Sequence, residues 1–489
     1  MSDEHQSTPD GHSHRRWLRI AKWVFAVVPV LLVLGHLLWG KLAESRLRNE
    51  LQRLASVGDP VTLEAIAPRV VSNALNGWIE LSQAIALLPK SSDIERQLND
   101  LTTEMEEDVR LPLRDNERDL LQKFVAERSS TREPIVRAST RPFIVTTQPV
   151  VPPLIMREMP ELKGLRELCD TLKYDAQLHA EAGDLTPALE NLSLIKTLAR
   201  AASSEPTLIG SLVGVGCRSV AALQLTEIAP LLTLDWLSTT ANRDAVEAMI
   251  RDLLEDGPID REFVYGLKCE RFGVLDSLDF LTGAMTTTRG PATPTPNTFA
   301  RYLLRPLSSS AKLKLVKRQT RTIEIANEKN YPGFKRAYQP ILKEIDKTRG
   351  SKIDILVNLL GQSMERVASV HYRCLTERRL AAVALAVRMY RLDHGDEWPA
   401  SLDALVPEYL PAVPLDLMAS GKRIQYRAGD RPVIWSVWED GSDDGATPQP
   451  PRAARYVNGS IARFDLVVDL LTQPRPVPAT QSSEEEDEP

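Results

Sequence analysis

The sequence predicts a mainly α-helical fold, with one transmembrane helix near the N-terminus and a small α+β domain at the C-terminus. One apolar run, residues 23–40, is the only stretch suited to a lipid bilayer. Apolar side chains recur at helical spacing along most of the chain that follows. Strand signals, which are short β-branched and aromatic runs, begin only at about Gln425.

The apolar run WVFAVVPVLLVLGHLLWG has 18 residues and no charged side chain. As a helix it spans about 27 Å, close to the hydrocarbon thickness of about 30 Å. Trp17, Trp23 and Trp39 stand near its ends, where indole rings prefer the membrane interface. A buried core helix and a cleaved signal peptide are the alternatives, but residues 38–42 offer no small-residue cleavage site. We therefore predict a permanent single-pass anchor.

The charges that flank this run predict its orientation. Residues 15–22 contain four basic side chains and no acid, whereas the basic side chains of residues 41–53 are more widely spaced and mixed with Glu44 and Glu50. Basic residues stay preferentially in the cytoplasm, so the tighter cluster predicts a cytoplasmic N-terminus. We expect a cell-membrane protein whose residues 41–489 lie outside the cytoplasm.

Composition divides the chain into seven segments. Polar residues open the chain, an acidic run closes it, and a Thr- and Pro-rich stretch interrupts the helical pattern. The predicted segments are a disordered N-terminus (1–14), a basic flank with the transmembrane helix (15–40), a helical domain (41–285), a linker or exposed loop (286–297), a helical segment (298–360), an α+β domain (361–472) and a disordered acidic tail (473–489).

Individual helices are predicted wherever the apolar periodicity is sustained. Thr186 and Pro187 suit the N-cap and first position of one helix. Residues 134–154 are rich in proline and β-branched residues, and we expect them to run extended. The predicted helices cover residues 41–55, 73–88, 93–108, 115–127, 162–182, 186–203, 207–229, 243–254, 312–328 and 352–390.

One predicted hairpin resembles a tetratricopeptide repeat. Ala176, Gly183 and Ala188 have the spacing of that repeat's small positions, where small residues let two helices approach and glycine allows a tight turn. The second helix is too long for the repeat, and a solenoid needs about three copies. The alternative is a lone helical hairpin.

No catalytic or cofactor motif is present in the sequence. Gly214 and Gly216 are a near miss for a dinucleotide-binding loop, but the third glycine and the preceding strand are missing. With Gly210 they are better explained by close helix packing. The four cysteines have neither zinc-ligand nor redox spacing, and we expect buried free thiols, with disulfide pairing in an oxidising compartment as the alternative. They are Cys169, Cys217, Cys269 and Cys374.

The net charge of −6 argues against nucleic acid as the main partner. We therefore predict no catalytic, cofactor-binding or metal-binding residue and no nucleic-acid partner.

The C-terminal block, residues 379–445, is the most distinctive part of the chain. An apolar helix leads into a polar turn, a short capped helix, a Pro-rich turn, two strands and an end rich in Asp and Gly. Trp435, in the second strand, is expected to be buried against the apolar helix. The characteristic runs are YRLDHGDEWP (390–399), SLDALVP (401–407), VPLD (413–416) and EDGSDDG (439–445).

This order of motifs resembles the globular part of type II secretion pseudopilins. The block lies far from the membrane segment and no prepilin cleavage site precedes residues 23–40, so the chain is not a processed pilus subunit. The whole layout also resembles a set of uncharacterised single-pass bacterial envelope proteins, which share the anchor, Leu-rich helices, a helix like that at 205–221 and the pseudopilin-like end. The resemblance implies an architecture and a compartment, but no activity.

We expect a membrane-anchored envelope scaffold or protein-interaction protein without evident catalysis, with the membrane and other proteins as its partners. One alternative is an enzyme of unknown, hydrolase-like class. It would need a cleft lined by Asp393, His394 and Glu397, with ionisable groups of perturbed pKa.

A second alternative is a calcium-dependent binding module. Asp440, Ser442, Asp443 and Asp444, with Asp416 from the preceding turn, offer the hard oxygen ligands that Ca²⁺ prefers. The spacing is not that of an EF-hand, and Asp-Gly pairs are also what a plain hairpin turn needs. We favour the turn.

Overall fold

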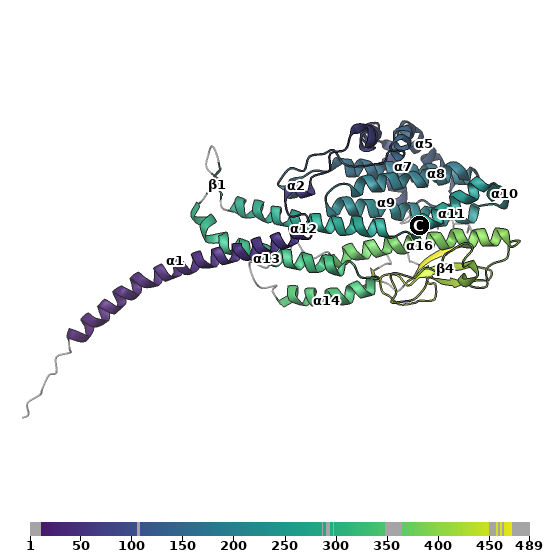
Figure 1. Cartoon of the computed structure of the whole chain (residues 1–489). Helices are drawn as coiled ribbons and strands as arrows, with labels where there is room; N and C mark the ends of the chain where they lie inside the picture. Colours follow the sequence, from purple (N-terminus) through teal and green to yellow (C-terminus); the bar gives the residue numbers. More distant parts are fainter. Residues whose placement is uncertain are drawn as a thin grey trace, which may run out of the picture.

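The computed structural model describes residues 11–104, 108–285, 287–289, 294–296, 298–347, 364–448, 456–457, 460–461 and 464–471. The chain is 69% helical and has a small three-stranded sheet, so the predicted mainly helical fold is confirmed. In Figure 1 one long helix projects from a body of stacked helices, and the sheet lies along one side of that body. Residues 1–10 and the predicted acidic tail lie outside the described residues.

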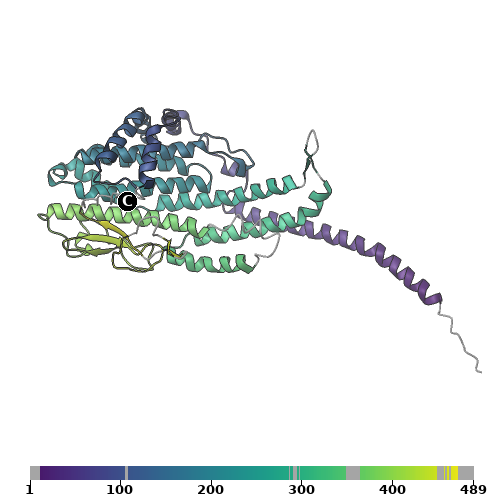
Figure 2. The same cartoon turned by 180° about the vertical axis from the view of Figure 1, so that it is seen from behind.

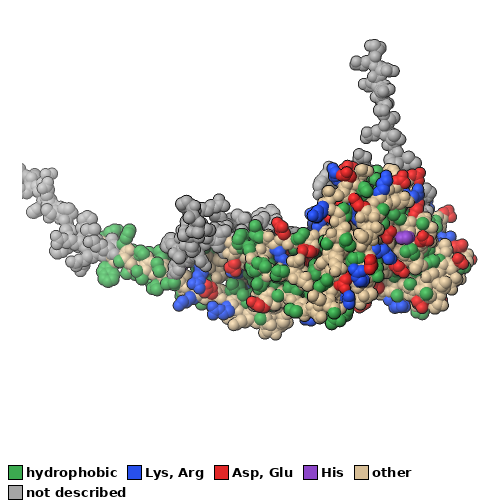
Figure 3. Space-filling view, turned by 90° about the horizontal axis from the view of Figure 1, so that it is seen from above, with side chains coloured by type: hydrophobic (Ala, Val, Ile, Leu, Met, Phe, Trp, Pro, Cys, Tyr) green, Lys and Arg blue, Asp and Glu red, His purple; other side chains and the backbone are tan. Residues whose placement is uncertain are grey.

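The projecting helix, α1 (Gly11–Ser56), is continuous over 46 residues. Its apolar side chains from Trp23 to Trp39 are largely exposed, and Figure 3 shows them along the projecting helix. Gly40 is buried, and from there α1 packs on α13 (Thr298–Ile325). The predicted continuation of the membrane helix through residues 41–55 is confirmed.

Two helices in the described part of the chain are long and apolar enough to cross a bilayer. The apolar window of the N-terminal one is only 6% buried, as expected for a helix that faces lipid. The other is α9 (Leu208–Ile228), whose window is 61% buried, as expected for a helix in a protein core. We therefore identify α1 as the candidate membrane span.

The body is built around α7 (Pro160–Glu181), α8 (Leu185–Ser203) and α9. The turn between α7 and α8 has Gly183 at φ +85°, a conformation that glycine adopts without strain. A tight helical hairpin is therefore present, while its resemblance to a tetratricopeptide repeat stays a prediction. The other helices of the body are α2 (Leu63–Ile66), α3 (Trp78–Ala86), α4 (Asp93–Glu104), α5 (Asp115–Arg128), α6 (Arg132–Ser139), α10 (Leu234–Leu237) and α11 (Thr240–Leu254).

Close packing of α8 and α9 depends on two glycines of α9. A Cβ added to Gly210 would lie 2.7 Å from the Ala202 carbonyl oxygen, and one added to Gly214 would lie 2.8 Å from that of Ala199. Real Cβ atoms do not approach so closely, so both positions require glycine. Gly216 has open space beside it, so the packing prediction holds for two of the three glycines.

Two local predictions are wrong. The N-cap of α8 is Asp184 and not Thr186, because the first helical residue is Leu185, two positions before Pro187. Residues 134–154 are not extended throughout, since α6 continues through their first residues. Pro134 lies in the first turn of α6, where its missing N–H would have had no partner within the helix.

The structure also contains α12 (Gly257–Met285), a helix that the sequence analysis does not predict. It packs on α13 and connects to it through β1 (Thr287–Arg289) and β2 (Pro294–Pro296), which pair antiparallel. The predicted linker or exposed loop at residues 286–297 therefore contains a short two-stranded ladder. After α13 comes α14 (Tyr331–Lys347).

The C-terminal sheet lies on α16 (Met364–Asp393). Its strands are β3 (Gln425–Arg427), β4 (Val433–Ser436) and β7 (Leu466–Asp469), all antiparallel in the order β3-β4-β7. A separate short ladder pairs β5 (Tyr456–Val457) with β6 (Ser460–Ile461). Residues 352–363 of the predicted helix lie outside the described residues.

Side chains alternate between the two faces of β4. Ile434 is fully buried in the same core as α16, with Tyr426 and Val468 as its cross-strand neighbours. Trp435 is buried as predicted, but its Nε1 donates to Asp443 Oδ1 at 3.1 Å. Alternation thus places Ile434, and not Trp435, toward the helix.

α16 lies between the helical body and the sheet (Figures 1 and 2). α9 and α11 pack on it from the body, and β4 packs on it from the sheet. The residues from Leu380 to Val387 are at most 1% exposed, and they belong to one core with the body and the sheet. This core crosses the predicted boundary between the helical and α+β domains.

Two arginines also hold α16 against the body. Arg388 Nε donates to the Leu232 carbonyl oxygen at 2.8 Å, and Arg378 Nη2 donates to that of Glu255 at 3.3 Å. Leu232 and Glu255 are the C-caps of helices, whose last carbonyl groups have no partner within the helix and carry partial negative charge.

We expect Leu385→Ala to lower the free energy of unfolding by about 2–5 kcal/mol, because the cavity would open in the middle of the shared core. The matched control is Leu415→Ala, since Leu415 is 50% exposed and its truncation should cost no more than about 0.5 kcal/mol. Chemical denaturation of the full-length protein in detergent measures both. Two equally small effects would contradict the central position of α16.

Candidate functional site

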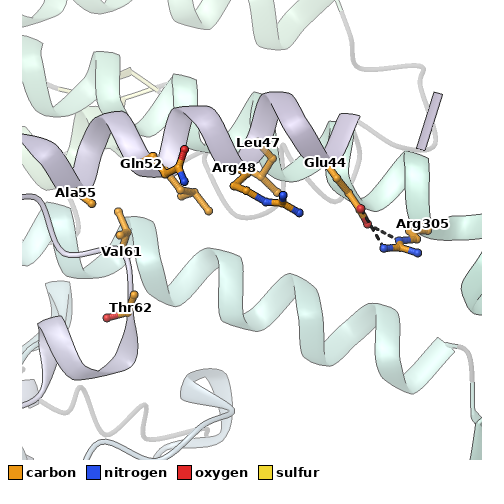
Figure 4. Close-up of a pocket in the computed structure, with 9 residues that line it drawn as sticks. Glu44, Leu47, Arg48, Gln52, Ala55, Val61, Thr62 and Arg305 are labelled. Carbon is orange, nitrogen blue, oxygen red and sulfur yellow. Dashed lines mark hydrogen bonds and ion pairs between the residues drawn. The ribbon is translucent and has the colours of Figure 1, made fainter. Parts of the chain in front are cut away.

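A pocket lined by described residues lies where α1 leaves the proposed membrane region. It has a volume of about 460 Å³ and lies between the C-terminal part of α1, the segment after it and α13 (Figure 4). Its lining residues are Glu44, Leu47, Arg48, Leu51, Gln52, Ala55, Val61, Thr62 and Arg305.

An ion pair stands at the membrane end of this pocket. Arg305 Nη2 donates to Glu44 Oε2 at 3.0 Å, and Arg305 Nε also donates to this carboxylate (Figure 4). The pair joins residues 261 positions apart in the sequence. At the far end Thr62 caps α2, its hydroxyl accepting from Ala65 N at 3.3 Å.

The chemistry of the pocket fits binding better than catalysis. Four of its lining residues are aliphatic, and its single carboxylate is already paired with a guanidinium. No histidine or cysteine lines it, and its one carboxylate and its one hydroxyl, those of Glu44 and Thr62, are engaged in an ion pair and a helix cap. It can accommodate an apolar group beside a charged one.

The residues of the hydrolase-like alternative hold a helix end and do not line this pocket. Asp393 is paired with Arg243, whose Nη1 and Nη2 donate at 3.0 and 2.6 Å, and it accepts from the Tyr409 hydroxyl at 2.9 Å. The His394 ring stacks on Tyr390 with centroids 3.9 Å apart, and its Nδ1 lies 2.8 Å from the Tyr390 carbonyl oxygen.

Glu397 is exposed in the turn that follows. The hydrogen bonds from Arg243 hold the pKa of the Asp393 carboxyl below its usual range. A carboxylate in this state is a poor proton donor near neutral pH, and the arrangement is that of a structural ion pair.

The residues of the calcium alternative mostly bind backbone N–H groups. Asp440 Oδ1 accepts from Ser442 N at 2.9 Å, and Asp443 Oδ1 accepts from Gly445 N at 3.1 Å. Gly441 and Gly445 have positive φ, as tight turns require. Within the described ranges, no three His, Cys, Asp or Glu side chains are placed to hold a metal ion.

Asp416 is buried and holds the preceding turn to β4. Its carboxylate accepts from Ser436 Oγ at 2.8 Å, Val437 N at 2.9 Å and Met418 N at 2.9 Å. Burial raises the pKa of Asp416, and these three donors oppose that rise. The residue therefore acts as a structural link between the turn and the sheet.

A buried histidine contact joins α12 to α16. His371 is 1% exposed, its Nε2 lies 2.9 Å from Asp260 Oδ1, and its ring stacks on Phe263 with centroids 4.1 Å apart. The sequence analysis assigns no role to His371. Its partner on α12 could not be found without predicting that helix.

The four cysteines are buried free thiols, as predicted. Burial raises the pKa of Cys269 to about 12 and that of Cys374 to about 11. Both thiols are therefore protonated near neutral pH and unsuited to nucleophilic catalysis.

The chain matches no protein-family model, and neither the curated proteins nor the solved structures gave a match.

We expect Arg243→Met to lower the stability by no more than about 1 kcal/mol at neutral pH, because the ion pair is partly exposed. The pKa of Asp393 is lowered in the folded state, so the contribution of the pair is present above the ordinary carboxyl pKa of about 4. It is lost as the pH falls through the lower folded-state pKa. The melting temperatures of wild type and variant should therefore converge below about pH 4.

Arg423→Met is the control, since it removes a more exposed ion pair, with Asp403. A difference between wild type and Arg243→Met that persists unchanged in acid would show that packing, and not charge, accounts for the effect.

Proposed function

We propose that this protein is a single-pass membrane-anchored scaffold, which holds its helical body outside the cytoplasm and binds other proteins there. The observation that carries the proposal is that α1 is one uninterrupted helix with two different parts. Its first part is apolar and exposed, and its second part packs against the body. A membrane anchor joined to a domain by a flexible linker would limit only the distance between the domain and the membrane. A continuous helix docked on that domain also fixes orientation.

Several contacts support a rigid connection between α1 and the body. Leu54 of α1 forms a small buried cluster with Leu275 of α12 and Val316 of α13. Just after the helix, Asp59 pairs with Lys268 Nζ and Arg271 Nη2, both at 2.7 Å. The three helices α1, α12 and α13 thus form a stalk between the proposed membrane and the body.

An exposed apolar ridge on the body supports a role in protein binding. It consists of Val151, Ile155 and Met156, which are 60%, 50% and 67% exposed. Exposed apolar side chains that lie together on a soluble surface often mark interaction sites. Met is among the residue types that are enriched at interfaces relative to the rest of the protein surface.

The ridge is held in place by polar contacts on both sides. Leu154 N donates to Asp276 Oδ2 of α12 at 2.6 Å, and Arg157 pairs with Glu205 at the start of α9. These bonds fix the backbone of the ridge, so that little conformational entropy is lost when a partner binds.

We also propose that residues 364–471 form a pseudopilin-like module. A long helix covered by a three-stranded antiparallel sheet supports this interpretation, as does the Pro-rich turn that Asp416 joins to β4. Pseudopilins act outside the cytoplasm, which agrees with the orientation predicted from the flanking charges.

We expect alkaline phosphatase fused after Pro489 to be active, because that enzyme functions only outside the cytoplasm and the span should place the body there. A fusion of a cytoplasmic reporter at the same position is the control. An inactive phosphatase fusion together with an active cytoplasmic reporter would reverse the topology.

We expect a photo-cross-linking amino acid at position 155 to give discrete adducts with another protein in intact cells. The same amino acid at Leu234, which is 56% exposed on the far end of the body, is the matched control. Val151→Ser with Met156→Ser should reduce the adducts from position 155 without changing stability, because both side chains are exposed. Equal adducts from positions 155 and 234 would show that the ridge is not a specific surface.

A further inference from the structure

The pocket beside α1 lies close to the surface of the proposed bilayer. α1 changes from exposed to packed at Gly40, and each further residue advances about 1.5 Å along the helix axis. Glu44 and Arg48, which line the pocket, therefore stand about 6 and 12 Å beyond the apolar span. The headgroup layer is about 5–7 Å thick on each side of the hydrocarbon core. One end of the pocket thus reaches the headgroups, and the other end points away from the membrane.

The walls of the pocket are mostly apolar on the side away from the membrane. Leu47, Leu51 and Val61 line it, and all three are partly buried against the small cluster that joins α1 to α12 and α13. Ala55 is exposed and lies beside Val61 in Figure 4. These side chains present apolar surface to the pocket, and an apolar ligand would remove that surface from water.

Two guanidinium groups stand at the membrane end of these walls. Arg305 has five N–H donors, of which the pair with Glu44 uses two. Arg48 makes no ion pair with any residue that the structure describes, and its guanidinium points toward the Glu44–Arg305 pair (Figure 4). That direction is expected, because helix side chains lean toward the N-terminus, which here is the membrane end. Two arginines and one carboxylate leave this end of the pocket with a net positive charge.

The size of the pocket suits one acyl chain. A water molecule occupies about 30 Å³ in the liquid, and a methylene group takes nearly the same space. A volume of about 460 Å³ therefore holds on the order of fifteen such groups. This matches a single acyl chain, whereas a phospholipid with two chains and a headgroup is too large to enter.

We propose that this pocket binds a single-chain anionic phospholipid from the bilayer, with the phosphate between Arg48 and Arg305 and the chain along Leu51 and Val61. The proposal rests on the anchoring role of α1 given above, because the anchor is what brings the pocket to a bilayer. The basic groups attract the anionic headgroup, and the apolar walls accept the chain. A protein segment is the competing occupant, and the experiment separates the two.

The test uses the full-length protein in nanodiscs of neutral phosphatidylcholine, with added lysophosphatidylglycerol that carries a photoreactive diazirine at the end of its acyl chain. In the bilayer the chain end lies near the midplane and reacts with the middle of the span, around Leu31. In the pocket the chain end points away from the membrane and reacts with residues 51–62. Mass spectrometry of the cross-linked peptides distinguishes the two positions.

We expect adducts both in the span and within residues 51–62. Adducts in the span alone would overturn the lipid site and leave the anchor intact, and they are the result expected if a protein segment occupies the pocket. Absence of adducts in the span would overturn the anchor itself. The two failures are therefore distinguishable.

A bulky side chain should exclude the acyl chain from the pocket. Ala55→Trp places an indole ring there, and we expect several-fold fewer adducts at residues 51–62, with those in the span unchanged. Ser56→Trp is the matched control, since Ser56 is the next residue of α1, is exposed and does not line the pocket. Melting temperatures check that both variants fold. Equal adducts at 51–62 in the two variants would overturn the assignment of these adducts to the pocket.

The preference for an anionic headgroup is tested by exchanging the probe for the corresponding lysophosphatidylcholine. We expect several-fold fewer adducts at residues 51–62 with the neutral probe, and Arg48→Gln should remove most of this difference. Arg46→Gln is the matched control and should keep it, since Arg46 is exposed at nearly the same level of α1 but does not line the pocket. Adducts that ignore headgroup charge, or that respond equally to both substitutions, would overturn the proposed role of Arg48.

Discussion

The burial of α16 on two sides is the constraint on which the rest of the structure depends. Residues 380–387 are apolar around the whole helix, and such a helix is stable in water only when neighbours cover every face. The body covers one side with α9 and α11, and the sheet covers another with β4. Strands of three or four residues would be marginal alone, so the sheet needs the helix as much as the helix needs the sheet.

The same logic explains how the anchor joins the body. Without neighbours, the second part of α1 would expose Leu54 to water. α12 and α13 supply the apolar surface that buries Leu54. Because α12 and α13 also contact α9 and α14, the stalk is continuous with the core of the body. A membrane span connected in this way positions the whole molecule, which is the property that a scaffold requires.

Local sequence signals predict much of this fold, and their failures have identifiable causes. The predicted helix at 207–229 is present as α9, and Thr207 caps it, with its hydroxyl accepting from Gly210 N. The missed helix α12 has Ile259, Phe263 and Leu267 buried at intervals of one turn, which is a readable signal. The Gly257-Pro258 pair before them is typical of a loop and obscures it, although proline is well tolerated in a first helical turn.

The candidate site could not be predicted from local sequence signals. The pocket needs Glu44 and Arg305 side by side, and nothing in the sequence indicates that these two distant helices pair. The same holds for Asp393. The sequence predicts its position in a polar turn, but it does not indicate its partner Arg243, which is 150 residues away. Tertiary packing brings such pairs together, and a single sequence does not specify it.

The central claim is that α1 runs from the bilayer into the body as one docked helix. Amide hydrogen exchange of the full-length protein in nanodiscs tests it most directly. The account predicts that amides 41–56 are protected nearly as well as those of α9, because they lie in a helix that packs along α13 and contacts α12 at Leu54. Rapid exchange at 41–56, with protection retained in the span and in α9, would show a flexible linker and contradict the account.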